Sequence, residues 1–276
     1  MLSPSVDRLI RMALEEDIGP GDVTTAATVA PDTPGRAELV AKEDFLLAGI
    51  GVARRVFALL DAQVSFEGLI EDGQAVRRGE VLAWLKGDAA SLLQGERVAL
   101  NLLQRLSGVA TLTARFVEAV EGTGATIVDT RKTTPGLRAL EKYAVRVGGG
   151  GNHRMALYDG VLIKENHIVA AGGIAVAVSR ARRYAPHTLK VEVEVRDLDE
   201  VTAALAAGAD ILLLDNMDLD QLRAAVELVA GRAVTEASGG VNLDSVRPIA
   251  ETGVDLISVG ALTHSYRAVD ISMLFA

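Results

Sequence analysis

Residues 191–216 read VEVEVRDLDEVTAALAAGADILLLDN and contain one complete strand–helix–strand repeat. Valine and glutamate alternate in the run Leu189–Val195, and Ile211–Leu214 is a short apolar run, so both predict strands. The alanine-rich residues 198–207 between them predict a helix. A strand, a crossover helix and a second strand in this order predict two parallel strands of one sheet.

The same rhythm extends in both directions from this repeat over the chain after residue 120. Further strands are predicted at Ala125–Val128, Val161–Ile163, Ala233–Val234 and Leu256–Val259, and further helices at 174–184, 218–230 and 243–252. Polar or glycine residues stand at the end of each of these strands. An open doubly wound sheet uses only the ends near one switch point, whereas a (β/α) barrel uses many. We therefore predict a barrel.

The residues before 120 predict a different organisation. Residues 5–17 have the periodicity of an amphipathic helix, and 37–41 and 45–47 predict short strands. An apolar helix is predicted near 52–60 and a turn-rich hairpin at 70–87. Residues 89–120 form the longest helical pattern, with a break expected at Ser107–Gly108 because glycine weakens a helix.

One face of that long helix is polar. Arg97, Asn101, Gln104 and Arg105 follow helical spacing and share this face. It is either a solvated surface, or a surface that meets a partner subunit or a binding cleft.

Composition excludes several classes of protein. The 276 residues carry a net charge of −9, with 28 Lys+Arg against 37 Asp+Glu, which argues against nucleic acid or an anionic membrane as a partner. There is no cysteine, so no disulfide framework and no thiolate metal site is expected. The first residues lack the uninterrupted apolar stretch of a signal peptide, and no apolar run approaches the ~20 residues of a membrane span. We expect a soluble, cytoplasmic protein.

A strongly basic segment lies inside this acidic chain. Between Arg131 and Arg154 the only acid is Glu141, against these cations: Arg131, Lys132, Arg138, Lys142, Arg146 and Arg154, with His153 in addition. Clustered positive charge is typical of an anion-binding cleft, although a solvated basic loop is the alternative. The glycines 148–151 and the turn Thr133–Thr134–Pro135–Gly136 favour the cleft, because they let backbone N–H groups approach an anion.

Carboxylates and glycine-rich loops complete the predicted site. Glu192 and Glu194 share one face of their strand and would point into the barrel, paired with Lys132, Lys164 or a metal. Glu194 and Asp215 could hold Mg²⁺ directly or through water. Two loops that each follow a strand are candidate phosphate sites: Ser238–Gly239–Gly240 and Val259–Gly260–Ala261. The residues thus describe a site for two anionic ligands, one of them phosphorylated.

The residues also bear on two other kinds of chemistry. The histidines show no paired spacing for zinc. Lys132 or Lys164 could instead serve as the Schiff-base lysine of an aldolase-like barrel.

The sequence also resembles a known family. The segment DTRKTTPGLRALEKYAVRVGGGGNHR at 129–154 and the run LIKENH at 162–167 resemble quinolinate phosphoribosyltransferases. Further matches in the same order are EDIGPGDVTT at 16–25, GERVALNLLQRLSGVAT at 95–111, VEVEV at 191–195, LLLDNM at 212–217, EASGGV at 236–241 and VGALTHS at 259–265. A paralogue linked to molybdenum transport shares this scaffold and is the nearest alternative, followed by the Schiff-base lyase and a non-catalytic anion-binding protein.

The resemblance implies a fold and an activity. The fold is an N-terminal α/β open-sandwich domain over 1–107 and an incomplete (β/α) TIM-like barrel over 108–276, with about the last ten residues returning to the N-terminal domain. The activity converts quinolinate and phosphoribosyl pyrophosphate to nicotinate mononucleotide, pyrophosphate and CO₂ with Mg²⁺, in a homodimer or higher homo-oligomer with shared active sites.

The resemblance also implies roles for single residues. Those expected to bind quinolinate are Thr130, Arg131, His153, Arg154 and Lys164, with Arg97 reaching in from the partner subunit. Those expected to handle phosphoribosyl pyrophosphate and Mg²⁺ are Lys132, Glu194 and Asp215. The phosphates would lie against Ser238, Gly239, Gly240, Val259, Gly260, Ala261 and His264. Glu192, two residues before Glu194, is an alternative for this role. The spacing to Asp215 makes Glu194 the better choice.

Overall fold

The computed structural model describes residues 3–275, and its contacts divide the chain into two compact units. Among the described residues, the first comprises 3–112, 135–148 and 266–275, and the second comprises 113–134 and 149–265. Residues 266–275 thus group with the N-terminal part of the chain. Residues 135–148 do so as well, although the sequence placed them with the barrel. Two hydrogen-bonded pairs within the first unit account for this: Tyr143 with Asp72, and Arg105 with Glu141.

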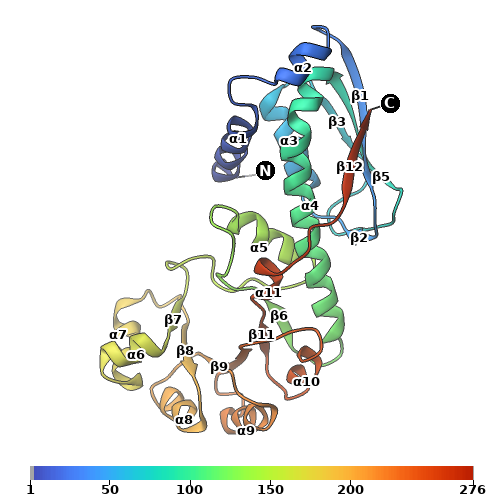
Figure 1. Ribbon diagram of the computed structural model, residues 1–276. Helices are drawn as coiled ribbons and strands as arrows, with labels where there is room; N and C mark the ends of the chain where they lie inside the picture. Colours follow the sequence, from blue (N-terminus) through green and yellow to red (C-terminus); the bar gives the residue numbers. More distant parts are fainter. Residues whose placement is uncertain (1–2, 276) are drawn as a thin grey trace. The chain divides into compact units, whose positions relative to one another are not determined.

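The first unit is a sheet covered by helices. Its elements are α1 (Pro4–Ile18), α2 (Val23–Thr28), β1 (Pro34–Ala41), β2 (Phe45–Leu46), α3 (Ile50–Leu60), β3 (Ser65–Gly68), β4 (Ala75–Val76), β5 (Val81–Asp88), the start of α4 (Ala89–Ala119), α5 (Arg138–Val147) and β12 (Ile271–Phe275). The antiparallel sheet has the order β12-β1-β5-β3, and α3 and α4 lie against one face of it (Figure 1). Leu39 and Leu85 are buried on that face, whereas Trp84 is 47% and Leu274 42% exposed. The predicted open sandwich is therefore confirmed.

Two predictions about this unit are wrong. Residues 70–87 do not form a hairpin, because β4 pairs with β2 and β5 pairs with β1 and β3. The helix α4 is continuous through Ser107–Gly108. Gly108 is there for a close approach: a Cβ on it would lie 2.3 Å from the carbonyl oxygen of Arg267, so no larger residue fits. None of the helices within residues 3–275, α4 included, has both the length and the apolar character to span a bilayer.

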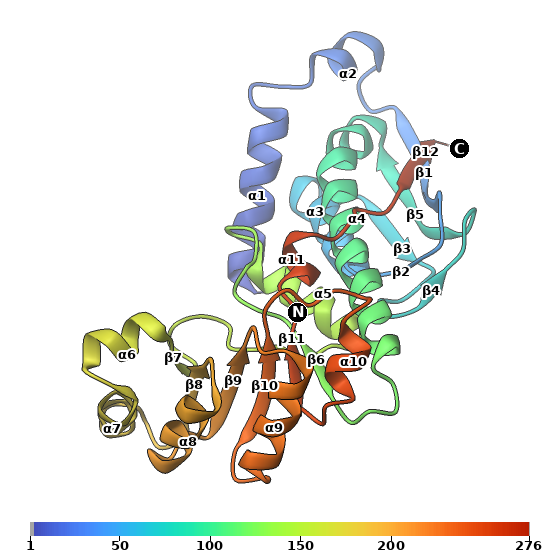
Figure 2. The same ribbon diagram turned by 60° about the horizontal axis from the view of Figure 1, so that its bottom comes forward.

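The second unit is a six-stranded parallel sheet. Its strands are β6 (Thr126–Val128), β7 (Val161–Ile163), β8 (Val191–Val195), β9 (Ile211–Asp215), β10 (Val234–Ser238) and β11 (Leu256–Ser258), in the order β6-β11-β10-β9-β8-β7. Its helices are α6 (Glu165–Ala171), α7 (Ile174–Tyr184), α8 (Leu198–Ala206), α9 (Leu219–Val229), α10 (Val246–Ala250) and α11 (Ala261–His264). Figure 2 shows α8 and α9 on the outside of the strands. Within the described residues β6 and β7 do not pair, and Gly151 bridges to Val128 at the β6 edge, so the barrel is incomplete as predicted.

The alternation in β8 positions the site. Val191, Val193 and Val195 are at most 1% exposed and pack outward, under the helices. Glu192 and Glu194 take the opposite face, as the two-residue period requires, and point into the barrel. The same period places Ile211, Leu213 and Asp215 of β9 on the inner face. The interior of this barrel is therefore polar as well as apolar.

Candidate active site

A cavity of about 480 Å³, here called the strand-end cavity, opens at the carboxyl ends of the strands of the second unit. It brings together most of the residues predicted from the sequence. They are Thr130, Arg131, Lys132, His153, Arg154, Lys164, Glu194, Asp215, Ser238, Gly239 and Gly240. Each follows or ends a parallel strand, or belongs to the segment that bridges to β6, and this shared edge is why residues distant in sequence meet here.

The remaining predicted residues do not line this cavity. Val259, Gly260 and Ala261 follow β11, and His264 ends α11. Gly260 is nevertheless next to the cavity, since a Cβ on it would lie 3.0 Å from Lys132 Cδ and 3.1 Å from His264 Nε2. Arg97 belongs to the first unit, where its side chain is 57% exposed on α4.

The basic segment separates into two parts. Arg131, Lys132 and Arg154 line the strand-end cavity, but the cations of α5, which are Arg138, Lys142 and Arg146, belong to the first unit. Lys142 and Glu141 are fully buried there, and Arg105 Nη2 donates to Glu141 at 2.6 Å. The cations of this segment that line the cavity are therefore those that flank α5 in sequence.

Like charges face one another in the cavity. Burial lowers the pKa of the Arg154 guanidinium, and the positive charge of Arg131 lowers it further. Arg154 Nη1 donates to the carbonyl oxygen of Gly160 at 3.1 Å, which fixes the side chain. Two guanidinium groups held together with little water are stabilised by a bound anion.

Asp129 anchors the segment that carries His153 and Arg154. This carboxylate is fully buried at the end of β6. Its Oδ1 accepts the backbone N–H of His153 at 2.9 Å, and its Oδ2 accepts the amide of Asn152 at 2.6 Å. Buried charge-assisted hydrogen bonds of this kind are strong, so Asp129 holds the segment in place.

Two carboxylates lie at the strand-end rim of the cavity. Glu194 Oε2 accepts from Lys164 Nζ at 2.7 Å, and Asp215 Oδ2 accepts from Asn216 Nδ2 at 2.9 Å. Gly239, at φ 104°, makes room for Asn216, whose Oδ1 would lie 2.2 Å from a Cβ at that position. Carboxylate oxygens are ligands that Mg²⁺ prefers, and those of Glu194 and Asp215 lie at the cavity, so these two residues fit this ion.

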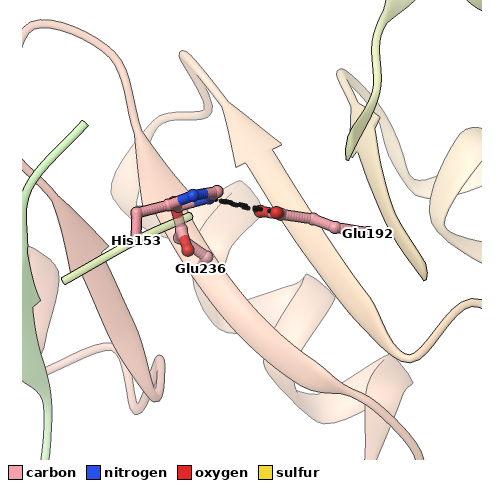
Figure 3. Close-up of side chains that lie close together, drawn as sticks. All are labelled: His153, Glu192 and Glu236. Atoms are coloured by element: carbon pink, nitrogen blue, oxygen red, sulfur yellow. Dashed lines mark hydrogen bonds and ion pairs between the residues drawn. The ribbon is translucent and has the colours of Figure 1, made fainter. Parts of the chain in front are cut away.

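A second group of titratable side chains lies at the floor of the cavity, where His153 and Glu236 line it and Glu192 lines the space beneath. His153, Glu192 and Glu236 come from three different segments and point toward one another (Figure 3). His153 Nε2 lies 3.0 Å from Glu192 Oε2 and 3.7 Å from Glu236 Oε1. One potential ligand atom of each lies within 4.8 Å of the others, so their spacing would suit a metal ion.

The hydrogen bonds of His153 argue against a metal at this floor. Its Nδ1 accepts the backbone N–H of Arg154 at 2.7 Å, so the neutral ring carries its proton on Nε2. That N–H points at Glu192, and a metal would need the lone pair of the same nitrogen. In this arrangement the lone pair of His153 Nε2 is therefore not available to a metal ion.

Glu236 is the least compensated group of the floor. It is 2% exposed, and within residues 3–275 its Oε1 accepts no hydrogen bond, since 3.7 Å from His153 is too far for one. Burial raises the pKa of Glu236 to about 7, the negative charge of Glu192 adds to this rise, and His153, Ser258 and Lys164 oppose it. The two glutamates cannot both ionise freely so close together.

Comparisons with known proteins place this site in a family. Residues 22–107 match the model of the quinolinate phosphoribosyl transferase N-terminal domain, and residues 109–274 match that of the C-terminal domain. This chain belongs to the quinolinate phosphoribosyltransferase family. A probable nicotinate-nucleotide pyrophosphorylase [carboxylating] of Bacillus subtilis is 47% identical, over 96% of this chain and 92% of that protein. Quinolinate phosphoribosyltransferase [decarboxylating] 1b of Nicotiana tabacum is 44% identical, over 96% and 81% of the two chains.

Solved structures agree with this family assignment. The crystal structure of NadC from Streptococcus pyogenes is 44% identical, covers 100% of this chain and 98% of that one, and superposes with a TM-score of 0.96. The nicotinate-nucleotide pyrophosphorylase from Francisella tularensis is 42% identical, covers 100% and 98%, and has a TM-score of 0.95.

Two groups in this quinolinate phosphoribosyltransferase site have no role predicted from the sequence. Glu236 lies two residues before Ser238 and so shares its face of the strand. Asp129 directly follows β6. Asp129 holds the site segment by accepting hydrogen bonds from Asn152 and His153, which follow it by more than 20 residues. No local sequence pattern reveals that these residues lie next to Asp129.

Proposed function

We infer that this chain transfers the phosphoribosyl group of phosphoribosyl pyrophosphate to quinolinate, releasing pyrophosphate and CO₂ and giving nicotinate mononucleotide. The observation that carries this inference is the composition of the strand-end cavity. It combines a set of cations suited to a dicarboxylate with a pair of carboxylates suited to a metal–pyrophosphate. Membership of the family supplies the substrates.

Quinolinate is assigned to the cationic side of the cavity. Arg131, Arg154 and Lys164 provide three positive charges for its two carboxylates, with His153 and Thr130 beside them. Arg guanidinium groups suit this task because they bind carboxylates in a bidentate manner. Binding also relieves the repulsion between Arg131 and Arg154.

Phosphoribosyl pyrophosphate is assigned to the opposite side. Ser238, Gly239 and Gly240 follow β10, and the backbone at Gly239 and Gly240 has positive φ. Lys132 lies close to Gly260 and His264, and Thr263 Oγ1 donates to the Lys132 carbonyl oxygen at 2.8 Å. Val259 and Ala261 flank Gly260 in the loop that follows β11. Because this loop lies beside Lys132, the Lys132 ammonium is available to the leaving pyrophosphate.

Glu194 and Asp215 would hold Mg²⁺, which when bound neutralises the developing charge of the leaving pyrophosphate. The chain itself supplies alignment: the cations hold the pyridine nitrogen of quinolinate toward C1 of the ribose. Lys132 stabilises the departing oxygen, and the two carboxylates stabilise positive charge developing on the sugar ring. Once the nitrogen is alkylated, the pyridinium withdraws electrons and the adjacent carboxylate leaves as CO₂.

The partner is proposed to be a second copy of this chain that contributes Arg97. Exposure of the Arg97 side chain on α4 supports this, because a guanidinium intended for another subunit must be accessible. Mixing inactive Arg97→Ala with inactive Lys132→Ala chains is expected to restore part of the activity, measured as product formation. Mixtures as inactive as the single variants would show that the sites are not shared. The cytoplasm is the proposed compartment, which the absence of cysteine supports.

The decisive assay follows pyrophosphate and CO₂ release from quinolinate and phosphoribosyl pyrophosphate with Mg²⁺. Equal amounts of both products and of nicotinate mononucleotide are expected. Binding of both substrates without release of either product would contradict the proposed function, as would covalent trapping of the substrate on lysine by borohydride.

A further inference from the structure

A second cavity lies beneath the floor of the strand-end cavity. This base cavity has a volume of about 490 Å³ and is lined near the amino ends of the strands by Val161, Lys190, Ile211 and Leu256, among others. His153, Arg154 and Glu236 line both cavities. The floor therefore lies between two cavities of one unit, and each cavity has polar as well as apolar lining residues.

Glu236 faces both spaces. It projects from β10, where the groups around it are Glu192 of β8, His153 and Arg154 of the bridging segment, Ser258 of β11 and Lys164 after β7. Its Oε1 accepts no hydrogen bond within residues 3–275. A carboxyl group in such surroundings keeps its proton more readily than an ordinary glutamate, and the pKa of about 7 agrees with this.

The proposed reaction needs a proton at one defined atom. When the carboxylate next to the pyridinium nitrogen leaves as CO₂, the electron pair of the broken C–C bond stays on the ring carbon. That carbon must take up a proton to give the product. Of the groups assigned above to quinolinate, Lys164 donates to Glu194 and the Nε2–H of His153 points at Glu192, so these protons are directed at carboxylates and not at the ring carbon.

We propose that Glu236 is the acid that protonates this ring carbon, and that water in the base cavity reloads it. The carboxyl O–H bond of Glu236 breaks as the new C–H bond forms, which leaves Glu236 as a carboxylate. A proton relayed from bulk solvent through water of the base cavity then restores the carboxyl group, so that the net proton comes from the solvent. The inference rests on the proposed function and goes beyond it by naming the donor.

The first experiment measures the pH dependence of kcat in the wild type, Glu236→Gln and Glu192→Gln. The wild type is expected to lose activity as pH rises through about 7, where Glu236 gives up its proton. This basic limb should vanish in Glu236→Gln, with kcat at pH 6 lower by about 100-fold or more, since general acids contribute on that order. In Glu192→Gln the limb should move to lower pH, because the charge that helps Glu236 keep its proton is gone.

A second measurement separates proton transfer from a structural role. Quinolinate binding to Glu236→Gln by calorimetry at pH 6 is expected to stay within about threefold of the wild type, because glutamine mimics the neutral carboxyl. Turnover in an equal mixture of H₂O and D₂O should also give a different hydrogen-to-deuterium ratio at the new C–H bond in Glu236→Gln, since its proton then comes from water directly.

The outcomes distinguish a failure of the proposed function from a failure of the assignment of Glu236 as the acid. A wild type that releases no CO₂ at any pH contradicts the proposed function itself. An active wild type whose basic limb persists in Glu236→Gln overturns the assignment of Glu236, as does a loss of quinolinate binding equal to the loss of turnover.

Discussion

The rim and the floor of the strand-end cavity each contain two carboxylates, but they differ in how those carboxylates are compensated. At the rim, Glu194 has the ammonium of Lys164 and Asp215 has the amide of Asn216. At the floor, Glu192 shares His153 with Glu236, and Glu236 receives no hydrogen bond on Oε1 within residues 3–275. Glu192 and Glu194 are only two residues apart on one strand. Depth along a barrel strand thus decides whether a carboxylate is suited to hold a cation or a proton.

The largest expected effect comes from the rim. Replacing Glu194 with Gln, or Asp215 with Asn, removes charge that is meant to stabilise the transition state, so kcat should fall by about 100- to 1,000-fold. Steady-state turnover against Mg²⁺ concentration measures this. A variant with normal turnover and normal Mg²⁺ dependence would show that the rim carboxylates do not differ in role from surface ones.

The floor carboxylates are expected to affect the pH dependence of the unfolding free energy rather than the dependence of turnover on Mg²⁺. The pKa of Glu236 is raised from 4.5 to about 7, so between these values the folded chain keeps a proton that the unfolded chain has released. Its unfolding free energy therefore decreases as pH rises across this window, by up to about 3 kcal/mol at ~1.4 kcal/mol per pH unit.

Glu236→Gln has no carboxyl group at this position and so lacks this pH-dependent decrease in unfolding free energy. The unfolding free energy of Glu236→Gln minus that of the wild type should therefore increase from pH 4.5 to pH 7 and then remain level. Thermal unfolding of the two chains over that range measures the difference. Parallel curves for both chains would place an ordinary, ionised carboxylate at the floor.

A smaller effect is expected on the cationic side. Arg154→Ala removes a charge-assisted contact worth roughly 1.5–3 kcal/mol, so quinolinate should bind about 10- to 150-fold more weakly and phosphoribosyl pyrophosphate nearly as before. Titration calorimetry with each substrate measures this. Arg223→Ala is the matched control, because Arg223 pairs with Asp220 on the exposed face of α9 and should leave both affinities unchanged. Equal losses for the two substrates would contradict the assignment of Arg154.

Much of this arrangement could be predicted from sequence because strand ends carry a local signal. The alternation in VEVEV correctly places Glu192 and Glu194 inside and the valines outside, and the residues after β6, β7 and β9 meet at one edge as expected. Local patterns also misled, at Gly108 and in α5. The low helix propensity of glycine predicts a break at Gly108, but a glycine is needed there because the backbone of Arg267 leaves no room for a Cβ. The cations of α5 look like part of the anion site, yet Lys142 is buried in the first unit.

The floor could not be predicted, because its members come from residues 153, 192 and 236 and acquire their properties only from burial together. No spacing in the sequence reports that His153 directs its Nε2 toward Glu192, since this depends on the backbone N–H of Arg154. The environment of a titratable group is a tertiary property, whereas the face of a strand on which it lies is a local one.

The most direct test of the contrast between rim and floor is the infrared difference spectrum between the wild type and Glu236→Gln, recorded in D₂O over a pH series. We expect a protonated carboxyl band at pH 6 that is present only in the wild type and is replaced by a carboxylate band above pH 8. A carboxylate band at pH 6, with no protonated carboxyl in the difference spectrum, would contradict it.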